Sequence, residues 1–154
     1  MSPRILVQSA AFDTGSEIAA LLAGRTDIGG VGCFIGTVRG AVGTRGIEAM
    51  TLEHYPGMTE RALASIAAKA ADRWPLQSVT IIHRIGRLLP GEPIVLVLTA
   101  SAHRQAALDS TAFLIDWLKT AAPFWKQEHF SDGETVWVAA KTDDDQAAAR
   151  WAQQ

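Results

Sequence analysis

The stretch from Ser101 to Glu128 constrains the fold most, because it joins a long helical periodicity to a proline break. Small or apolar side chains recur here at steps of three and four residues, which predicts a helix with one wide apolar face. These side chains are Ala106, Ser110, Phe113, Leu114, Trp117, Leu118 and Ala121. Pro123 lacks an N–H and disfavours helical geometry in the residue before it, so the helix is expected to end near Ala121 or Ala122. Ser101 is the predicted N-cap.

His103 and Arg104 are expected on the first turn of this helix. Free N–H groups and the helix dipole favour an anion at that position, so two cations there gain nothing from the dipole. A bound phosphate or carboxylate would explain them. A solvated helix end with a chance histidine–arginine pair is the alternative, and the spacing leaves both open.

Two of the four lysines, Lys119 and Lys126, flank the proline break beside Trp117, Phe124 and Trp125. A lysine among aromatic side chains is a candidate base or nucleophile, because desolvation favours the neutral amine. Alternatively, the aliphatic stem of such a lysine covers apolar surface while its amine reaches water.

Length and composition predict one domain over residues 1–154, since 48% hydrophobic residues are ample for a core. A net charge of −2 argues against a general nucleic-acid binder, so any anion site must be local. The single cysteine, Cys33, excludes an internal disulfide, and no cysteine–histidine cluster has zinc spacing. No secretory leader or membrane-spanning run is visible, so a cytoplasmic protein is expected.

The order of the expected elements favours an α+β fold with a mixed or largely antiparallel sheet. Helices are expected after a capping-box spacing of Thr14 with Glu17, in residues 56–74, in the long stretch above, and, as a short helix, in the tail. Strands are expected at residues 4–8, 29–38, 47–54, 79–85, 94–100, 125–129 and 135–139. Residues 39–46 resemble a flexible hairpin loop that could close over a ligand, and Asp132-Gly133 is a second hairpin signal.

His103 and Lys119 are sixteen positions apart, which on one straight helix means roughly 24 Å and about 160° of rotation. They cannot grip the same small ligand. If both belong to one site, two copies of this helix must meet in antiparallel fashion, as in a two-fold symmetric dimer.

Motifs along nearly the whole chain resemble the catalytic large subunit family of molybdopterin synthase. They are FIGTVRG, LEHYPGMTE, RWPL, VTIIHRIG, LPGE, SAHR and DWLKTAAPFWKQE. The resemblance implies an α/β hammerhead-type fold with three main helices. It also implies a heterotetramer, in which a central dimer of large subunits carries a small ubiquitin-like subunit at each end.

The resemblance further implies a sulfurtransferase of molybdenum cofactor biosynthesis. The small subunit's Gly-Gly tail ends in a thiocarboxylate and donates sulfur to cyclic pyranopterin monophosphate. Two such donations form the dithiolene of molybdopterin, without a metal or another cofactor.

Carried over by position, the resemblance makes Lys119 the key catalytic lysine and Lys126 a second lysine of the substrate pocket. The positions implied to bind substrate are Arg39, His103 and Arg104, which hold the phosphate, together with Phe34, Thr37, Val38, Gln127, Glu128 and Lys141. Gln127 stands where relatives commonly have a basic residue, and Lys141 where they often have arginine.

Two other functions stay open. A non-catalytic docking module for a ubiquitin-like partner would keep the dimer and the tail groove without turnover, although the two lysines weigh against it. A small sensor of phosphate ligands would bind a pterin or nucleotide without the partner. Cys33 lies in an apolar strand, where a cysteine is more often inert packing than a sulfur carrier.

Overall fold

The computed structural model describes residues 1–138 and 142–153. The strands are β1 (Arg4–Gln8), β2 (Gly30–Thr37), β3 (Ala41–Val42), β4 (Arg45–His54), β5 (Leu76–Arg84), β6 (Gly86–Leu88), β7 (Pro93–Ser101), β8 (Phe124–Phe130) and β9 (Thr135–Trp137). The helices are α1 (Thr14–Leu22), α2 (Met58–Arg73), α3 (Arg104–Thr120) and α4 (Thr142–Ala149), followed by a 3-10 turn, η1 (Arg150–Gln153).

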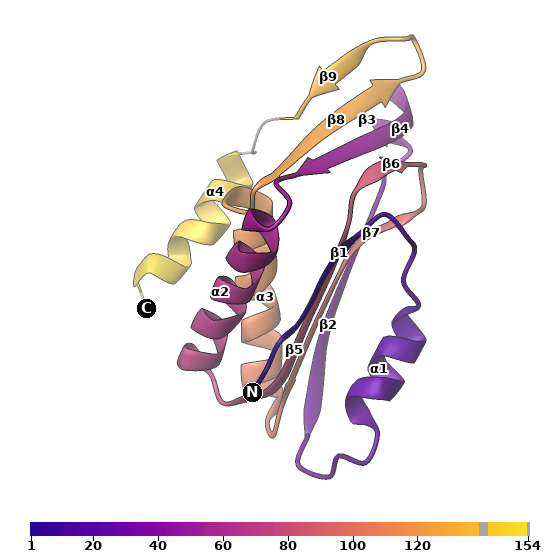
Figure 1. Ribbon diagram of the computed structural model, residues 1–154. Coiled ribbons are helices and arrows are strands. Elements are labelled where there is room, and N and C mark those ends of the chain that lie inside the picture. The colour runs from indigo at the N-terminus through magenta and orange to yellow at the C-terminus, as the bar shows by residue number, and fades with distance from the viewer. Residues whose placement is uncertain (139–141, 154) are drawn as a thin grey trace.

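The first sheet has the strand order β1-β5-β7-β2, in which only the β1–β5 pair is parallel. Its central strands β5 and β7 are buried along most of their length. Helices cover both faces: α2 and α3 lie on one side and α1 on the other (Figure 1). Because both faces are covered, β7 is a near-continuous apolar run, and β5 carries buried apolar side chains on both of its faces, at Val79, Ile81 and Ile82.

Two apolar clusters follow from these layers. The larger lies between the sheet and the α2–α3 layer and includes Leu63, Ile81, Val97 and Leu114. The smaller contains Ile82, Leu96 and Leu98, with α1 residues packed against it. Odd and even positions of β5 thus serve opposite clusters, as the two-residue period of a strand requires.

The second sheet stands beyond one end of the first and follows the path β3-β4-β8-β9 (Figure 1). β3 pairs with the start of β4, and β6 pairs with β4 further along, from Met50 to Leu52. β4 is its longest strand, with ten residues, and it pairs antiparallel with β8 from Ile47 to His54. The second sheet therefore meets the end of α3, because β8 begins four residues after that helix stops.

The α+β prediction is confirmed. The end of α3 is also confirmed, since the helix stops at Thr120 and Ala121 is its C-cap. The hairpin between β8 and β9 forms as expected. Residues 39–46 do not join two paired strands, because β2 and β4 lie in different sheets; a smaller hairpin, β3 with the start of β4, forms within them instead. The short C-terminal helix forms too, whereas Ala139, at the end of one expected strand, lies outside the described residues.

Two predicted helix caps are wrong. Ser101 ends β7, where its hydroxyl donates to the Pro75 carbonyl at 2.8 Å, and His103 is the N-cap of α3. Asp13 caps α1 in place of Thr14, because its carboxylate accepts the Ser16 N–H at 2.8 Å. Strand β6 was not expected, because it lies in a turn-rich stretch.

None of the helices in the described part of the chain has the length and apolar character needed to span a membrane.

Candidate functional site

A cavity of about 300 Å³ lies where the end of α3 meets the second sheet. Its polar lining consists of Thr37, Arg39, Lys119, Thr120, Lys126, Glu128 and Asp144. Its apolar lining consists of Val42, Ile47, Met50, Ile94, Leu118, Ala122, Phe124 and Val138. Five of the residues singled out from the sequence, from three separate segments, thus share one pocket.

Lys119 enters this cavity from the last turn of α3. The neighbouring Leu118 is buried in the main core and fixes the rotation of the helix there. A cation in the last turn also interacts favourably with the helix dipole, so Lys119 is stable there without a ligand.

Lys126 reaches the cavity from β8, on the other side of the proline break. Phe124, Lys126 and Glu128 all line the cavity, while the intervening Trp125 and Gln127 do not. This alternation is the two-residue period of a strand, so the register of β8 decides which side chains face the pocket. Gln127 therefore lies on the opposite face from the two charged residues beside it.

Arg39 and Thr37 reach the cavity from the end of β2 and the residues after it. Val38, between them, is a core residue with 2% of its surface exposed. Its backbone is held by the following turn, since its N–H donates to the Glu92 carbonyl at 3.0 Å and its own carbonyl accepts the Gly91 N–H at 2.8 Å. Val38 thus anchors the segment that presents Arg39.

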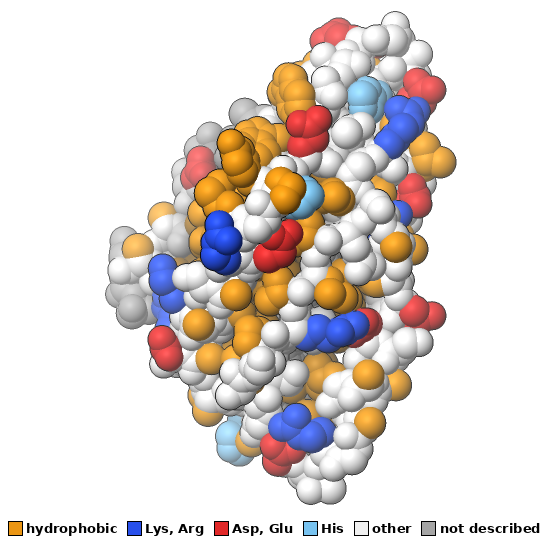
Figure 2. Space-filling model, viewed as in Figure 1, with side chains coloured by type: hydrophobic (Ala, Val, Ile, Leu, Met, Phe, Trp, Pro, Cys, Tyr) orange, Lys and Arg blue, Asp and Glu red, His pale blue; other side chains and the backbone are white. Residues whose placement is uncertain are grey.

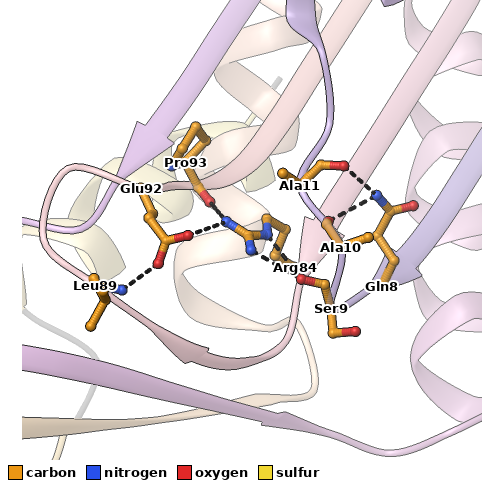
Figure 3. Close-up of polar contacts among 8 residues, drawn as sticks. All are labelled: Gln8, Ser9, Ala10, Ala11, Arg84, Leu89, Glu92 and Pro93. Atoms are coloured by element: carbon orange, nitrogen blue, oxygen red, sulfur yellow. Dashed lines mark hydrogen bonds and ion pairs between the residues drawn. The ribbon is translucent and has the colours of Figure 1, made fainter.

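The turn that holds Val38 is itself fixed by the buried guanidinium of Arg84. This group donates to the Ser9 carbonyl at 3.0 Å and to the Pro93 carbonyl at 3.1 Å, and it lies 3.4 Å from the Glu92 carboxylate (Figure 3). Glu92 in turn accepts the Leu89 N–H at 2.6 Å. The VTIIHRIG and LPGE motifs therefore meet in one network that supports the Arg39 segment.

Three cations and two carboxylates line the cavity among the described residues: Arg39, Lys119 and Lys126 against Glu128 and Asp144. The net charge of these five side chains is therefore one positive charge. The cavity has a size that small ligands occupy. This charge favours an anionic ligand.

His83, which the sequence reading did not single out, lies behind this wall. Its ring stacks on Phe124 with centroids 3.7 Å apart, and its Nδ1 donates to the Arg84 carbonyl at 2.8 Å. Burial, with smaller contributions from the positive charges of Lys126 and Lys119, lowers the pKa of His83 to about 3. A histidine directly after the apolar pair Ile81 and Ile82 of a predicted strand was the available signal.

His103 and Arg104 lie at the opposite end of α3, exposed to solvent. Neither is among the described residues that line the cavity, so one chain does not bring them to Lys119. Phe34 packs against the main core. Lys141 lies outside the described residues.

Cys33 is exposed on β2, and partial burial raises the pKa of its thiol. A raised pKa disfavours the thiolate, which is the nucleophilic form of cysteine. The expectation that Cys33 is packed inside an apolar strand is wrong, because its side chain is exposed, and the raised pKa leaves the thiol a poor nucleophile.

Exposed aromatic side chains gather beside the cavity on the other face of β8. Tyr55, Trp125 and Trp137 line a shallow hollow together with Glu53 and His54. Figure 2 shows apolar side chains clustered at this end of the molecule, over β8, β9 and the start of α2. A patch of this kind is typical of an interaction surface.

Comparison with known proteins gives a consistent result. The family model described as MoaE protein matches residues 7–121. The molybdopterin synthase catalytic subunit of Mesorhizobium japonicum is 53% identical over 152 residues, which cover 98% of this chain and 94% of that protein.

Among solved structures, the molybdopterin biosynthesis MoaE protein from Burkholderia ambifaria is 51% identical, with a TM-score of 0.82 over 97% of this chain and 98% of that one. A complex of subunits 1 and 2 of the molybdopterin-converting factor from Helicobacter pylori contains the same fold, at 21% identity and a TM-score of 0.71 over 92% of each chain. The family match over most of the chain, with identities above 50% across its length, shows that this chain belongs to the MoaE protein family.

Proposed function

We propose that this chain is the catalytic subunit of a molybdopterin synthase, a sulfurtransferase of molybdenum cofactor biosynthesis. It moves two sulfurs from the thiocarboxylated tail of a small ubiquitin-like subunit to cyclic pyranopterin monophosphate. The observation that carries the proposal is the cavity in which Lys119, Lys126 and Arg39 converge from three segments. The name of the Mesorhizobium relative supports the same reaction.

The residues divide into two roles. Arginine's planar fork suits a phosphate, so Arg39 is assigned to hold the substrate anion and to neutralise the charge that develops when the cyclic phosphate opens. Lys119 is assigned to the reacting carbon, where an amine can transfer a proton or stabilise charge. Lys126, two residues from Glu128 on the same face of β8, is assigned to orient the substrate.

The partner is a small subunit whose C-terminal tail enters this cavity. The two-subunit complex from Helicobacter pylori has this fold in one of its chains, which supports a pairing of this kind. The reaction is assigned to the cytoplasm, because a chain with one cysteine forms no internal disulfide and therefore needs no oxidising compartment.

The complete site is assigned to two copies of the chain. Lys119 and the His103–Arg104 pair lie at opposite ends of a 17-residue helix, roughly 24 Å apart. An antiparallel pair of these helices supplies both ends to each site, so the working unit is a dimer of large subunits with a small subunit at each end.

A sulfur-transfer assay tests the proposal. The chain is mixed with cyclic pyranopterin monophosphate, with and without thiocarboxylated small subunit, and dithiolene product is measured. Product only in the presence of the thiocarboxylate is expected. Binding of the small subunit without product would indicate the docking module, and pterin binding that ignores the small subunit would indicate a sensor.

A further inference from the structure

Strand β5 ends in the pair His83 and Arg84, whose side chains lie on opposite faces of the first sheet. Successive side chains of a strand alternate between the two faces. His83 therefore shares the α2–α3 face with Ile81 of the main core, and Arg84 lies on the other face with Ile82. The backbone of His83 is paired with β1 on one side and with β7 on the other, so its place in the sheet is fixed.

The ring of His83 supports the wall of the cavity that carries Lys126. It stacks on Phe124 with the centroids 3.7 Å apart and 15° between the ring planes. Phe124 is the first residue of β8 and lines the cavity, and Lys126 follows it on the same face of the strand. The stack therefore joins the start of β8, in the second sheet, to a central strand of the first sheet.

Arg84 supports the wall that carries Arg39. Its guanidinium fixes the turn before β7 (Figure 3), and that turn binds the backbone of Val38, the residue before Arg39. The two walls are joined within the pair itself, because Nδ1 of His83 donates to the Arg84 carbonyl at 2.8 Å. One pair of residues is thus the common support of Lys126 and Arg39.

Histidine combines a flat ring with an N–H donor, and His83 uses both. A phenylalanine can stack on Phe124 but has no N–H for the Arg84 carbonyl, whereas an asparagine can donate but has no ring. Burial lowers the pKa of His83 to about 3, with smaller contributions from the charges of Lys126 and Lys119, so the ring is neutral at physiological pH. It therefore supports β8 without adding a positive charge near the two amines.

We propose that His83 is a positioning residue of the substrate site, which sets the place of Lys126 relative to Arg39 through its stack on Phe124. The role rests on the proposed function, because Lys126 and Arg39 are the groups assigned there to the substrate. His83 is not among the described residues that line the cavity, so it acts through β8 and not by touching the substrate. Loss of the stack is expected to loosen Lys126 and to weaken substrate binding.

Two substitutions separate the two contacts of the ring. His83→Asn keeps a donor for the Arg84 carbonyl and removes the stack, so KM for cyclic pyranopterin monophosphate should rise about tenfold with little change in kcat. His83→Phe keeps the stack and removes the donor, so it should recover most of this loss. Steady-state sulfur transfer with thiocarboxylated small subunit measures both. A wild-type KM in folded His83→Asn protein would overturn the proposal.

A double-mutant cycle tests whether His83 acts through Lys126. In the Lys126→Ala background, His83→Asn should cause no further rise in KM, because the amine that it positions is already gone. Losses that add would show that His83 affects the site by another route, and the proposal would then be wrong.

Val79→Ala is the matched control for lost stability. Val79 is fully buried on the same face of β5, four positions before His83, and it is not among the described residues that line the cavity. Its truncation should lower the midpoint of urea unfolding, yet leave KM unchanged. An equal rise in KM for Val79→Ala and His83→Asn would mean that lost core packing explains the effect, and positioning would be refuted.

Amide exchange gives a readout that needs no substrate. The amides of β8 should exchange faster in His83→Asn than in Val79→Ala, because only the first variant removes the support of that strand. Circular dichroism establishes that each variant is folded, and His83→Leu, which has neither ring nor donor, replaces His83→Asn if the latter is not.

Equal exchange of β8 in these two variants would contradict the positioning role. Faster exchange of β8 together with a wild type that makes no product would leave the positioning of Lys126 standing and remove the proposed function. The failure of one is therefore distinguishable from the failure of the other.

Discussion

The two ends of α3 carry the same kind of charge in opposite surroundings. At the C-terminal end, Lys119 lies in a cavity with Lys126 and Arg39, and the helix dipole favours it there. At the N-terminal end, His103 and Arg104 are exposed, and the dipole opposes their charge. One end lies in a pocket, while the other is exposed at the surface. This difference is what the proposed sharing of each site between two chains would explain.

The largest effect is expected at the cavity end. Lys119→Ala should lower the sulfur-transfer rate by at least about 100-fold, because the proposed function assigns this amine to the reacting carbon. The fold should persist, since Leu118 and Leu114 hold this turn in the core. Single-turnover assays check the rate, with Lys69→Ala, an exposed lysine of α2, as the control. Near-normal turnover by folded Lys119→Ala protein would remove the catalytic assignment.

Lys126→Ala should be severe but closer to a binding defect. Loss of an orienting cation should raise KM about tenfold or more, and high substrate should recover part of the rate. Steady-state kinetics over a wide range of substrate concentration separate KM from kcat. A fall in kcat with unchanged KM would give Lys126 a chemical role in place of a binding role.

At the exposed end, Arg104→Ala should weaken substrate binding about tenfold, the size expected for one charge-assisted hydrogen bond. The loss should shrink as salt is added, because exposed charges are screened. Titration calorimetry at low and moderate salt checks this, and Gln105→Ala on the same turn is the neutral control. Unchanged affinity of Arg104→Ala at both salt concentrations would remove the phosphate role.

The smallest effect concerns the wall behind Lys119. The pKa of His83 is about 3 in the folded protein against 6.5 ordinarily, so between these values the unfolded chain binds a proton that the folded chain does not. Acidification through this window therefore favours unfolding, by about 1.4 kcal/mol per pH unit. Urea unfolding from pH 6 to pH 4 should show a shallower fall for His83→Gln than for wild type. Equal slopes would mean that His83 titrates normally.

Much of the fold could be predicted because its signals are local. Pro123 ends α3 at Thr120, and Asp132-Gly133 makes the β8–β9 hairpin, each through backbone restrictions of the residues themselves. The predictions of the helix N-caps were wrong because the identity of a cap depends on which side chain reaches a free N–H. Ser101 is engaged by Pro75, 26 positions earlier, and that contact has no local signature.

The site was predicted in part for the same reason. The two lysines stood out because aromatic side chains lie beside them in sequence. The distance between Lys119 and His103 could be predicted from the length of the helix that joins them. Asp144 and His83 were missed, since tertiary packing of α4 and β5 places them at the cavity or behind it. Resemblance to a family gave positions such as Arg39 but not the Arg84–Glu92 network that supports its segment.

The central claim, that each site takes one end of α3 from each of two chains, is tested most directly by mixing two variants that are each strongly impaired when the substrate concentration is well below KM. Lys119→Ala and Arg104→Ala chains are allowed to exchange in the presence of excess small subunit. Half of the dimers are then mixed, and each mixed dimer has one doubly damaged site and one intact site, so activity should return to about a quarter of wild type. If each site lay within one chain, every site would keep a lesion, and no recovery after verified exchange would contradict the shared site.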